Sequence, residues 1–457
     1  MVARSEPSNR GENKERPDET GVDGHAAGAP AVATRGLSSL RPFHHRNYLL
    51  LWSGGMVSVI GSWMQTVAVG ALVVSHTGSA TWAVVIAAGG FLPIGLLSPI
   101  GGALADRIAR RPALVAGNLL AGAVALAIAL LVAAGRDSPV SLTLLVTLQG
   151  SVSALVGPFQ QAILPDLVPA SEFLAAVSLN SAQFNLGRVI GPALAGASIA
   201  AFGYPVAFVA NAASFLAVVV ALLFVQLSPP LGRVENTGLF ASLRVGARAA
   251  RSEPGCRAAI STIAVVALLA SPFIALVPVM AHHLTKSGAR GVASATGLLT
   301  TAQGLGAVAG AVTIPSLALR FGRGRVLTDS LALLPGVLVL YGFAPSLSFA
   351  ISALFLVGLA YIGVLSGLST VVQLRAPAEL RGRVLSLYLV ALGVSYPIGS
   401  LVQGPLADSI GLAWTTAGTG ILLAIALILG RVLRPAAFHA LTSPSPKEVP
   451  TPAIGAS

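Results

Sequence analysis

The chain has 457 residues and a formal net charge of +12; 54% of its residues are hydrophobic and only 10% are charged. Soluble domains carry about 25% charged residues, so this composition excludes a water-soluble globular protein and indicates an integral membrane protein. The single cysteine, Cys256, excludes an internal disulfide and a zinc site made of cysteines.

Two polar tails flank the apolar part of the chain. Residues 1–40 mix both charges with Gly and Pro, and residues 436–457 include the stretch TSPSPKEVPTP. Segments of this composition bury too little apolar surface to fold, so we predict disordered tails. No apolar segment precedes residue 47, so a cleaved signal peptide is not expected.

Twelve apolar segments between the tails are long enough to cross a bilayer, because a helix needs about 20 apolar residues to do so. They lie at 48–74, 80–104, 112–134, 141–164, 173–201, 205–227, 258–281, 294–318, 326–344, 346–373, 384–407 and 412–433. The segments lack the period-two alternation of a barrel. The sequence therefore predicts an all-α integral membrane protein with twelve transmembrane helices.

The distribution of Lys and Arg predicts the orientation. With the N-terminus inside, only Arg136, Lys286 and Arg290 fall in external loops and only Arg188 falls within a helix, whereas the rest of the 28 Lys and Arg residues lie inside. Because cytoplasmic loops carry the excess of Lys and Arg, we expect both termini in the cytoplasm. The net charge of +12 thus reports membrane topology, and nucleic-acid binding is not expected.

The loop after the second segment reads GGALADRIARRP and concentrates charge in a nearly uncharged region. It holds one glycine, one acid and three arginines of interest: Gly102, Asp106, Arg107, Arg110 and Arg111. Arginines in an internal loop determine topology and can tie neighbouring loops through charge-assisted hydrogen bonds, whereas an acid contributes little to topology. Asp106 is therefore the residue that topology leaves unexplained.

Small residues form one face of the fifth segment. Gly187, Gly191 and Ala195 recur every four residues and Gly196 follows, which allows a neighbouring helix to approach closely. Pro192 removes a backbone donor and can bend the helix. The pattern fits either generic small-residue packing or a functional bend.

Arg188 lies near the middle of the same segment, where a charge costs about 2.5–3.5 kcal/mol even on a lenient insertion scale. It shares a helical face with Ser181, Asn185 and Pro192, so this face should look into protein or water instead of lipid. Two roles fit this residue. It is either a structural arginine bonded to helix ends and amides, or a cavity cation that meets an anionic substrate group or modulates proton coupling.

An internal repeat relates the two parts of the chain. IGPALAG at 190–196 matches IGSLVQG at 398–404, and the same offset pairs Gly203 with Gly411. Two parallel six-helix units are typical of secondary transporters. We therefore expect a disordered cytoplasmic tail at 1–40, six-helix halves at 41–227 and 258–435, a cytoplasmic linker at 228–257 and a disordered tail at 436–457.

These motifs resemble those of the major facilitator superfamily. That family's loop after helix 2 reads G-x-x-x-D-R-x-G-R-R, and this chain matches it except for Ala109 at the inner glycine. The family's exporter signature reads G-x-x-x-G-P-x-x-G-G. This chain matches it at Gly187, Gly191, Pro192 and Gly196, and has Ala195 in place of one glycine. RAPAELRGRVLSL at 375–387 is similar to the loop before helix 11 in the transmembrane secretion effector branch, which includes macrolide, tetracycline and enterobactin exporters. The resemblance covers roughly residues 40–435.

The resemblance implies a secondary active exporter of amphipathic organic compounds, such as a drug or a siderophore. It implies proton coupling, alternating access and no cofactor, in a monomer in the bacterial cytoplasmic membrane. In the family the loop acid, here Asp106, latches the halves against the start of helix 11, and the helix-5 bend is associated with efflux.

Helices 1, 4, 7 and 10 line the cavity in this family. Polar and aromatic residues of these helices and of the Arg188 face are therefore the candidate substrate contacts: Ser58, Gln65, Gln149, Gln160, Asn185, Arg188 and Tyr361. Hydrogen bonding between helices is the alternative role for each of them.

The chain departs from the family's antiporter signature in helix 4, because Val146 stands where that signature has arginine. No Asp or Glu lies at the centre of a predicted helix; Asp166, Asp329 and Asp408 lie near helix ends, which leaves the proton-carrying residue open. The chain has no G-x-x-x-x-G-K-[ST] phosphate loop, and its paired histidines are adjacent and diverge on a helix, so neither ATP hydrolysis nor a metal site is expected. The alternatives to an exporter are an importer or uniporter, and a transport-dead membrane scaffold or sensor.

Overall fold

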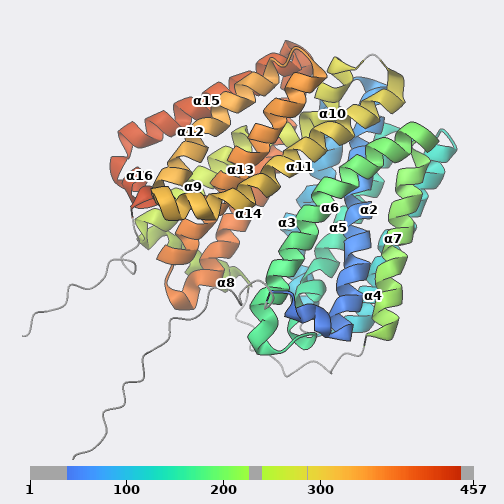
Figure 1. Ribbon diagram of the computed structural model, residues 1–457, viewed down its shortest axis with the longest axis horizontal. Helices are drawn as coiled ribbons and strands as arrows, with labels where there is room; N and C mark the ends of the chain where they lie inside the picture. Colours follow the sequence, from blue (N-terminus) through green and yellow to red (C-terminus); the bar gives the residue numbers. More distant parts are fainter. Residues whose placement is uncertain (1–38, 106, 226–238, 286, 444–457) are drawn as a thin grey trace, which may run out of the picture.

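The computed structural model describes residues 39–443 except 106, 226–238 and 286. Within these residues the chain forms helices and short connections, with no strand. Two groups of helices lie side by side, and the amphipathic helix α8, Leu239–Ser252, lies between them in the sequence (Figure 1). The all-α membrane fold expected from the sequence is confirmed.

Long helices make up both halves of the described chain. The N-terminal half contains α2 Arg46–Thr77, α3 Ala80–Ala105, α4 Arg110–Ala133, α5 Pro139–Ala162, α6 Phe173–Phe202 and α7 Pro205–Phe224. The C-terminal half contains α9 Pro254–Leu269, α10 Phe273–Leu284, α11 Gly288–Phe321, α12 Arg323–Gly342, α13 Leu347–Arg375, α14 Arg381–Ile410 and α15 Leu412–Leu433. Short 3-10 turns are η2 Arg41–His44, η3 Leu164–Asp166, η4 Ala170–Glu172 and η5 Ala378–Leu380.

Eleven segments of the described chain are long and apolar enough to cross a membrane, one fewer than the sequence predicted. The helix outside this set is α6, although its 30 residues are ample for a crossing. Its polar residues, among them Asn180, Gln183, Asn185 and Arg188, lower its hydropathy. Such residues are tolerated in a membrane where a helix faces protein or a cavity, and α6 packs between α2 and α11.

The segment predicted as one helix at 258–281 is divided. α9 ends at Leu269, and α10 starts at Phe273 directly after Pro272. A proline cannot donate to the helical hydrogen-bond ladder, and it disfavours a helical conformation in the residue before it. The break places the buried Ser271 in the interior of the C-terminal half.

α6 and α14 are structural repeats at the offset that the sequence predicted. Each has 30 residues, each directly follows a 3-10 turn, and each ends at a glycine with positive φ, 86° at Gly203 and 92° at Gly411. Positive φ is costly for residues with a Cβ, so glycine allows the chain to leave each helix and start the next.

The two glycines of each repeated motif have equivalent contacts. A Cβ on Gly191 of α6 would lie 2.8 Å from a backbone oxygen of α2, and one on Gly399 of α14 would lie 2.0 Å from a backbone oxygen of α9. These glycines therefore bring each repeat helix against the first helix of its own half. Gly196 and Gly404 instead face the other half, Gly196 against α11 and Gly404 against α3.

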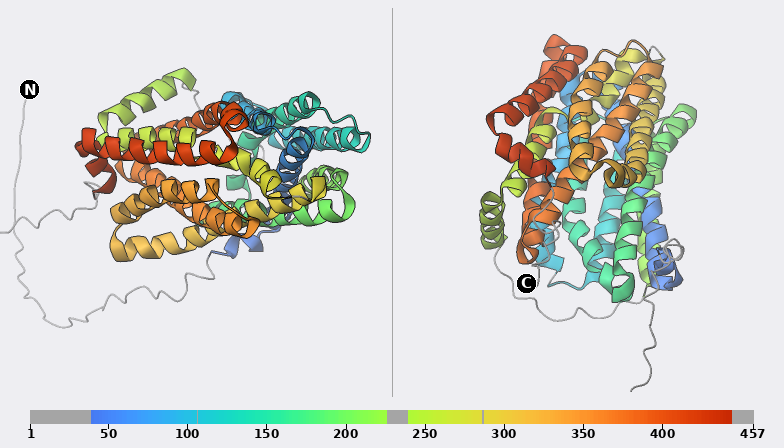
Figure 2. Two further views of the ribbon diagram at one scale, coloured as in Figure 1. Left: turned by 90° about the horizontal axis from the view of Figure 1, so that it is seen from above. Right: turned by 60° about the vertical axis from the view of Figure 1, so that its left-hand side comes forward.

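The segment predicted as a cytoplasmic linker, 228–257, contains a helix. α8 occupies Leu239–Ser252, and α9 already starts at Pro254. Ala249 and Ala250 of α8 are buried, and Arg248 is exposed. Figure 2 shows α8 on the outside of the bundle, where one face can pack and the other can face water.

The C-terminal tail predicted at 436–457 is also partly helical. α16, Pro435–Thr442, buries Ala440 and Leu441 against the C-terminal half. This contact stabilises a short helix that composition alone does not reveal. The rest of that tail and most of the N-terminal tail, residues 444–457 and 1–38, lie outside the described residues.

Candidate functional site

The two halves meet mainly along two helix pairs, the α6–α11 seam and the α3–α14 seam, with smaller contacts of α2 with α10 and α11 and of α3 with α10. Each seam joins the fifth long crossing of one half to the second crossing of the other. Both seams are held by hydrogen bonds and by close approaches at glycines. These contacts lie in one part of the molecule, from the middle of the helices to the end where α2 ends and α3 starts. That end is opposite to the one at which α2 starts.

Arg188 lies in the middle of the α6–α11 seam. Its Nη2 donates a hydrogen bond of 2.7 Å to Oε1 of Gln303 in α11, and its guanidinium carbon lies 5.8 Å from the ring centroid of Trp63 in α2. The negative face of an indole attracts a cation at this distance. Arg188 therefore contacts both halves of the molecule at once.

Close backbone contacts bring α6 and α11 together around this pair. Thr301 Oγ1 donates to the carbonyl oxygen of Val189 at 3.3 Å. A Cβ on Gly297 would lie 2.5 Å from the carbonyl oxygen of Pro192, so this approach requires glycine. Pro192 of the exporter motif thus lies at the seam itself, and α6 runs without interruption through it.

Two other glycines of the exporter motif lie where α6 contacts its neighbours, one against α2 and one against α11. A Cβ on Gly187 would lie 2.3 Å from Val59 Cγ1 of α2, and a Cβ on Gly196 would lie 3.3 Å from Ser294 of α11. The small-residue face inferred from the sequence is therefore the face on which α6 touches α2 and α11. An efflux-specific bend at this motif stays a prediction.

Two polar groups of the Arg188–Gln303 pair have no hydrogen-bond acceptor among the described residues. They are the Nε of Arg188 and the Nε2 of Gln303, and both atoms are buried. A buried donor without an acceptor costs about 1–3 kcal/mol, and more when the group is charged. The seam therefore presents two donors at one place, one from each half.

Five carboxylates of the described chain lie in pairs with other basic residues, and Asp408 binds the start of α3. The pairs are Asp137 with His76, Asp166 with Arg110, Glu172 with His45, Glu253 with Arg375, and Asp329 with Arg325. Arg188 takes part in none of these ion pairs. No ion pair in the described chain therefore supplies Arg188 with a counter-charge.

Tyr361 lies next to this site from the C-terminal half. Its side chain is 5% exposed, and its hydroxyl shares a hydrogen bond of 2.7 Å with Ser271 Oγ at the break between α9 and α10. Its ring packs edge-on against Phe273, with centroids 5.8 Å apart. Tyr361 lies near enough to Arg188 to influence it electrostatically, so two of the candidate contacts named from the sequence lie in the same region of the structure.

A pocket with a volume of about 150 Å³ lies inside the N-terminal half. Ser58 and Gln160, two of the predicted contacts, line it together with Tyr48, Trp52 and Gln183. Several of its polar groups are already paired, since Trp52 Nε1 donates to a backbone oxygen of α6 and Gln183 Nε2 donates to the Trp52 carbonyl oxygen. The walls of this pocket therefore combine polar and apolar side chains, and part of the polar lining is already hydrogen-bonded within the protein.

Three further predicted contacts are Gln65, Asn185 and Gln149. Gln65 is 6% exposed, and its Oε1 accepts a hydrogen bond of 2.7 Å from Asn211 Nδ2 of α7, so it fulfils the interhelical alternative. Asn185 Nδ2 donates to the Ser181 carbonyl oxygen one turn earlier in its own helix. Gln149 lies on α5 and has a buried Oε1 without a donor among the described residues.

The charged loop after α3 ties three elements together. Arg110 Nη1 donates to Asp166 of η3, and Arg111 Nη2 donates to the Leu223 carbonyl oxygen near the end of α7 at 2.7 Å. A cation near the C-terminus of a helix also interacts favourably with the helix dipole. Arg107 is exposed and Gly102 lies in open space, whereas Asp106 lies outside the described residues, so its latch role stays a prediction.

Asp408 closes the other seam and was seen in the sequence only as an acid near a helix end. Its carboxylate accepts hydrogen bonds from the Ala80 and Thr81 backbone N–H groups, at 2.6 and 3.0 Å, and from Ser79 Oγ at 2.8 Å. A carboxylate here satisfies free N–H groups and the positive end of the α3 dipole. Asp408 of one half thus caps a helix of the other half.

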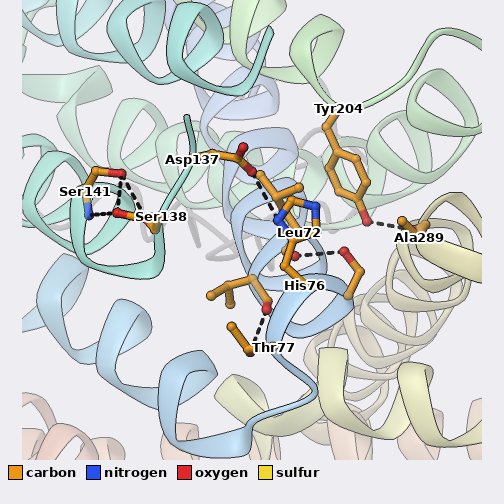
Figure 3. Close-up of polar contacts among 10 residues, drawn as sticks. Leu72, His76, Thr77, Asp137, Ser138, Ser141, Tyr204 and Ala289 are labelled. Atoms are coloured by element: carbon orange, nitrogen blue, oxygen red, sulfur yellow. Dashed lines mark hydrogen bonds and ion pairs between the residues drawn. The ribbon is translucent and has the colours of Figure 1, made fainter. Parts of the chain in front are cut away.

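Polar contacts also surround the end of α2 (Figure 3). His76 Nδ1 lies 3.3 Å from Oδ2 of Asp137, whose side chain is 7% exposed. Tyr204 donates to the carbonyl oxygen of Ala289 at 2.7 Å and so links the start of α7 to the start of α11 (Figure 3). Burial raises the pKa of Tyr204 to about 12 against the opposing effect of a hydrogen bond with Ser75, which keeps the phenol protonated and able to donate at neutral pH.

The most informative residues that the sequence did not single out are Gln303 and Asp408. A polar residue in the apolar stretch TTAQGLGAV was a visible signal for Gln303, but its partner was not. Within the described residues, no group of three His, Cys, Asp or Glu side chains is placed to hold a metal ion.

Comparison with known proteins gives one family match over nearly the whole chain. The family model described as transmembrane secretion effector matches residues 37–457. The chain is 26% identical over 374 residues to the multidrug efflux pump Tap of Mycolicibacterium fortuitum, covering 80% of this chain and 90% of Tap. It is 25% identical over 375 residues to the staphyloferrin A transporter of Staphylococcus aureus, covering 81% of this chain and 92% of that transporter.

Solved structures of transporters share the fold. The inward-facing, unoccupied structure of a bacterial homologue of the human lysosomal transporter Spinster superposes with a TM-score of 0.63. It covers 87% of this chain and 97% of that one at 16% sequence identity. At this identity the likeness concerns the arrangement of helices alone.

Proposed function

The chain belongs to the transmembrane secretion effector family of the major facilitator superfamily, and from this premise we propose that it exports amphipathic organic compounds across the bacterial cytoplasmic membrane. Efflux pumps are among its relatives, which supports export over the opposite direction. Protons drive the exchange in this proposal, and both termini lie in the cytoplasm.

The observation that carries the proposal is the pair of seams. Asp408 caps α3 across one seam, and Arg188 binds Gln303 across the other. These contacts join the halves from mid-helix to the end at which α3 begins, and they are polar and non-covalent. In the proposed cycle this end is the closed external side of an inward-facing carrier, and rocking of the two halves breaks the contacts and opens it. Asp106 then latches the opposite end.

Transport in everted membrane vesicles tests the proposal. Neutral, cationic and anionic fluorescent amphipathic compounds are offered to vesicles with and without a proton gradient. If the protein is an exporter, everted vesicles accumulate at least one of these compounds, and they do so only when the proton gradient is present. Accumulation in right-side-out vesicles instead indicates an importer, and no accumulation in either orientation indicates a scaffold or sensor.

The latch is tested in the same vesicles with Asp106→Asn. The variant should insert normally but transport more slowly, because the state closed to the cytoplasm loses a charge–dipole contact. The matched control is Asp329→Asn, since the Asp329 carboxylate is 70% exposed in a pair with Arg325. Wild-type rates in a well-expressed Asp106→Asn variant contradict the latch.

A further inference from the structure

We infer that Arg188 and Gln303 form a carboxylate-binding subsite and that the transported compounds are organic carboxylates held there. This inference deepens the proposed function and rests on it. Its basis is the pair of buried donors that the α6–α11 seam leaves without an acceptor among the described residues.

The orientation of the Gln303 amide follows from chemistry. A guanidinium group has only donors, so the group of Gln303 that faces Arg188 Nη2 at 2.7 Å must be the amide oxygen. The Nε2 group, with its two N–H bonds, is thereby directed away from Arg188 Nη2. Because Arg188 Nε also lacks an acceptor, the hydrogen-bonded pair offers donors from two side chains to one ligand.

Charge selects the ligand among the possible acceptors. Arg188 carries a full positive charge that no ion pair in the described chain neutralises. A carboxylate has two acceptor oxygens and one negative charge, so it can accept from both donors and supply the missing counter-charge. A neutral carbonyl could accept one hydrogen bond but would leave the charge uncompensated.

The surroundings suit the organic part of such a molecule. Trp63 lies beside the guanidinium and packs edge-on against Phe184, with ring centroids 5.8 Å apart. From the other half comes the ring of Tyr361, which packs edge-on against Phe273. Ligand sites combine apolar and aromatic walls with a few fixed polar groups that orient the ligand. Aromatic groups near a single cation therefore favour an amphipathic anion over a small inorganic one.

Binding to the purified protein tests the subsite directly. The test compounds are 2-naphthoate and its neutral isostere 2-naphthamide, measured by calorimetry. The wild type should bind the carboxylate at least tenfold more tightly than the amide. Equal affinity for the two compounds overturns the inference. It is also overturned if sodium chloride, at the same concentration as naphthoate, displaces bound naphthoate as well as unlabelled naphthoate does.

Gln303→Glu is the decisive variant, because it places a carboxylate of the protein beside Arg188. This internal counter-charge should abolish the preference for naphthoate without lowering the melting temperature, whereas Arg188→Gln should abolish the preference whether or not it is less stable. Thr301→Val, which changes the same seam without touching the two donors, should retain the preference. A Gln303→Glu protein that binds naphthoate as well as the wild type shows that the subsite does not exist.

Vesicle transport separates failure of this inference from failure of the proposed function. If wild-type vesicles take up neither compound, nor any other amphipathic probe, the exporter proposal fails, while a binding preference of the purified protein would still stand. If vesicles accumulate naphthamide as fast as naphthoate, export stands and the carboxylate inference fails.

Discussion

The two seams are built from equivalent helices but have different chemistry. Position 188 of α6 corresponds to position 396 of α14 in the internal repeat, and both residues look across to the second crossing of the other half. In the α6–α11 seam the residue is Arg188, bonded to Gln303. In the α3–α14 seam it is Tyr396, whose ring packs edge-on against Phe91 with centroids 5.4 Å apart.

This difference separates the shared architecture from the specialised site. The glycines that set the distance between helices are repeated in both halves, because any such fold needs the same close approach. The charged side chain is present in one half only, and it is the one that a ligand could use. The aromatic seam is instead completed by its own residues, with Asp408 as a cap at its end.

The largest expected effect tests the shared architecture. Gly399→Ala would place a Cβ 2.0 Å from a backbone oxygen of α9, and Gly191→Ala would place one 2.5 Å from the Trp63 Cβ. Neither contact is made with the flexible end of a side chain, so we expect each substitution to lower the free energy of unfolding by about 1–3 kcal/mol or more.

The control for these glycines is Gly393→Ala, a position of α14 with open space around it. It should be neutral or slightly stabilising, since alanine favours a helix over glycine by about 0.5–1 kcal/mol. Thermal unfolding of the three purified variants gives the comparison. Equal melting temperatures for Gly399→Ala and Gly393→Ala contradict the packing.

The cap across the α3–α14 seam should have the next largest effect. Asp408→Ala removes the acceptor of the Ala80 and Thr81 N–H groups, and loss of such a cap costs about 0.5–2 kcal/mol. We expect a lower melting temperature and a wider distribution of distances between spin labels at residues 78 and 410. An unchanged distribution shows that the cap does not hold the seam closed. Asp329→Ala, an exposed acid, should change neither quantity.

Replacing the second glycine of each repeated motif, Gly196 or Gly404, should show which seam is packed more tightly. A Cβ on Gly404 would lie 2.3 Å from Val84 Cγ2 and 3.0 Å from the Thr81 Cα, whereas a Cβ on Gly196 would lie 3.3 Å from its nearest atom in Ser294. We therefore expect Gly404→Ala to cost about 1 kcal/mol and Gly196→Ala less than about half of that. The reverse order in thermal unfolding would show that the α6–α11 seam is the tighter one.

An effect of similar size concerns a single hydrogen bond beside the α6–α11 seam. Tyr204→Phe removes the bond to the Ala289 carbonyl oxygen and should lower stability by about 0.5–1.5 kcal/mol. Tyr341→Phe is the matched control, because the buried Tyr341 hydroxyl has no hydrogen-bond partner among the described residues. Its loss should be neutral or stabilising. If both variants melt at the same temperature, the Tyr204 bond does not strengthen that side of the interface.

The sequence by itself determined the features that depend on local composition and on repetition. Apolar length predicted the membrane helices, because a helix in lipid must satisfy its backbone internally and present apolar side chains. The repeated glycines predicted which helices correspond in the two halves, and Arg188 was recognised because a charge in a membrane is costly wherever it lies. The sequence placed α6 among the membrane segments, at 173–201, but it left α8 inside a linker and α16 inside a disordered tail, because burial against neighbouring helices is not visible in composition.

Only the tertiary structure decided which polar groups are partners. Arg188 and Gln303 are 115 residues apart, Gln65 and Asn211 are 146 apart, and Ala80 and Asp408 are 328 apart. No helical period relates such positions, since each pairing depends on how whole helices cross. The same polar residue in an apolar helix can therefore be an interhelical strut, as Gln65 is, or part of an incomplete site, as Gln303 is, and the difference lies in whether the neighbouring helices supply all of its hydrogen-bond partners.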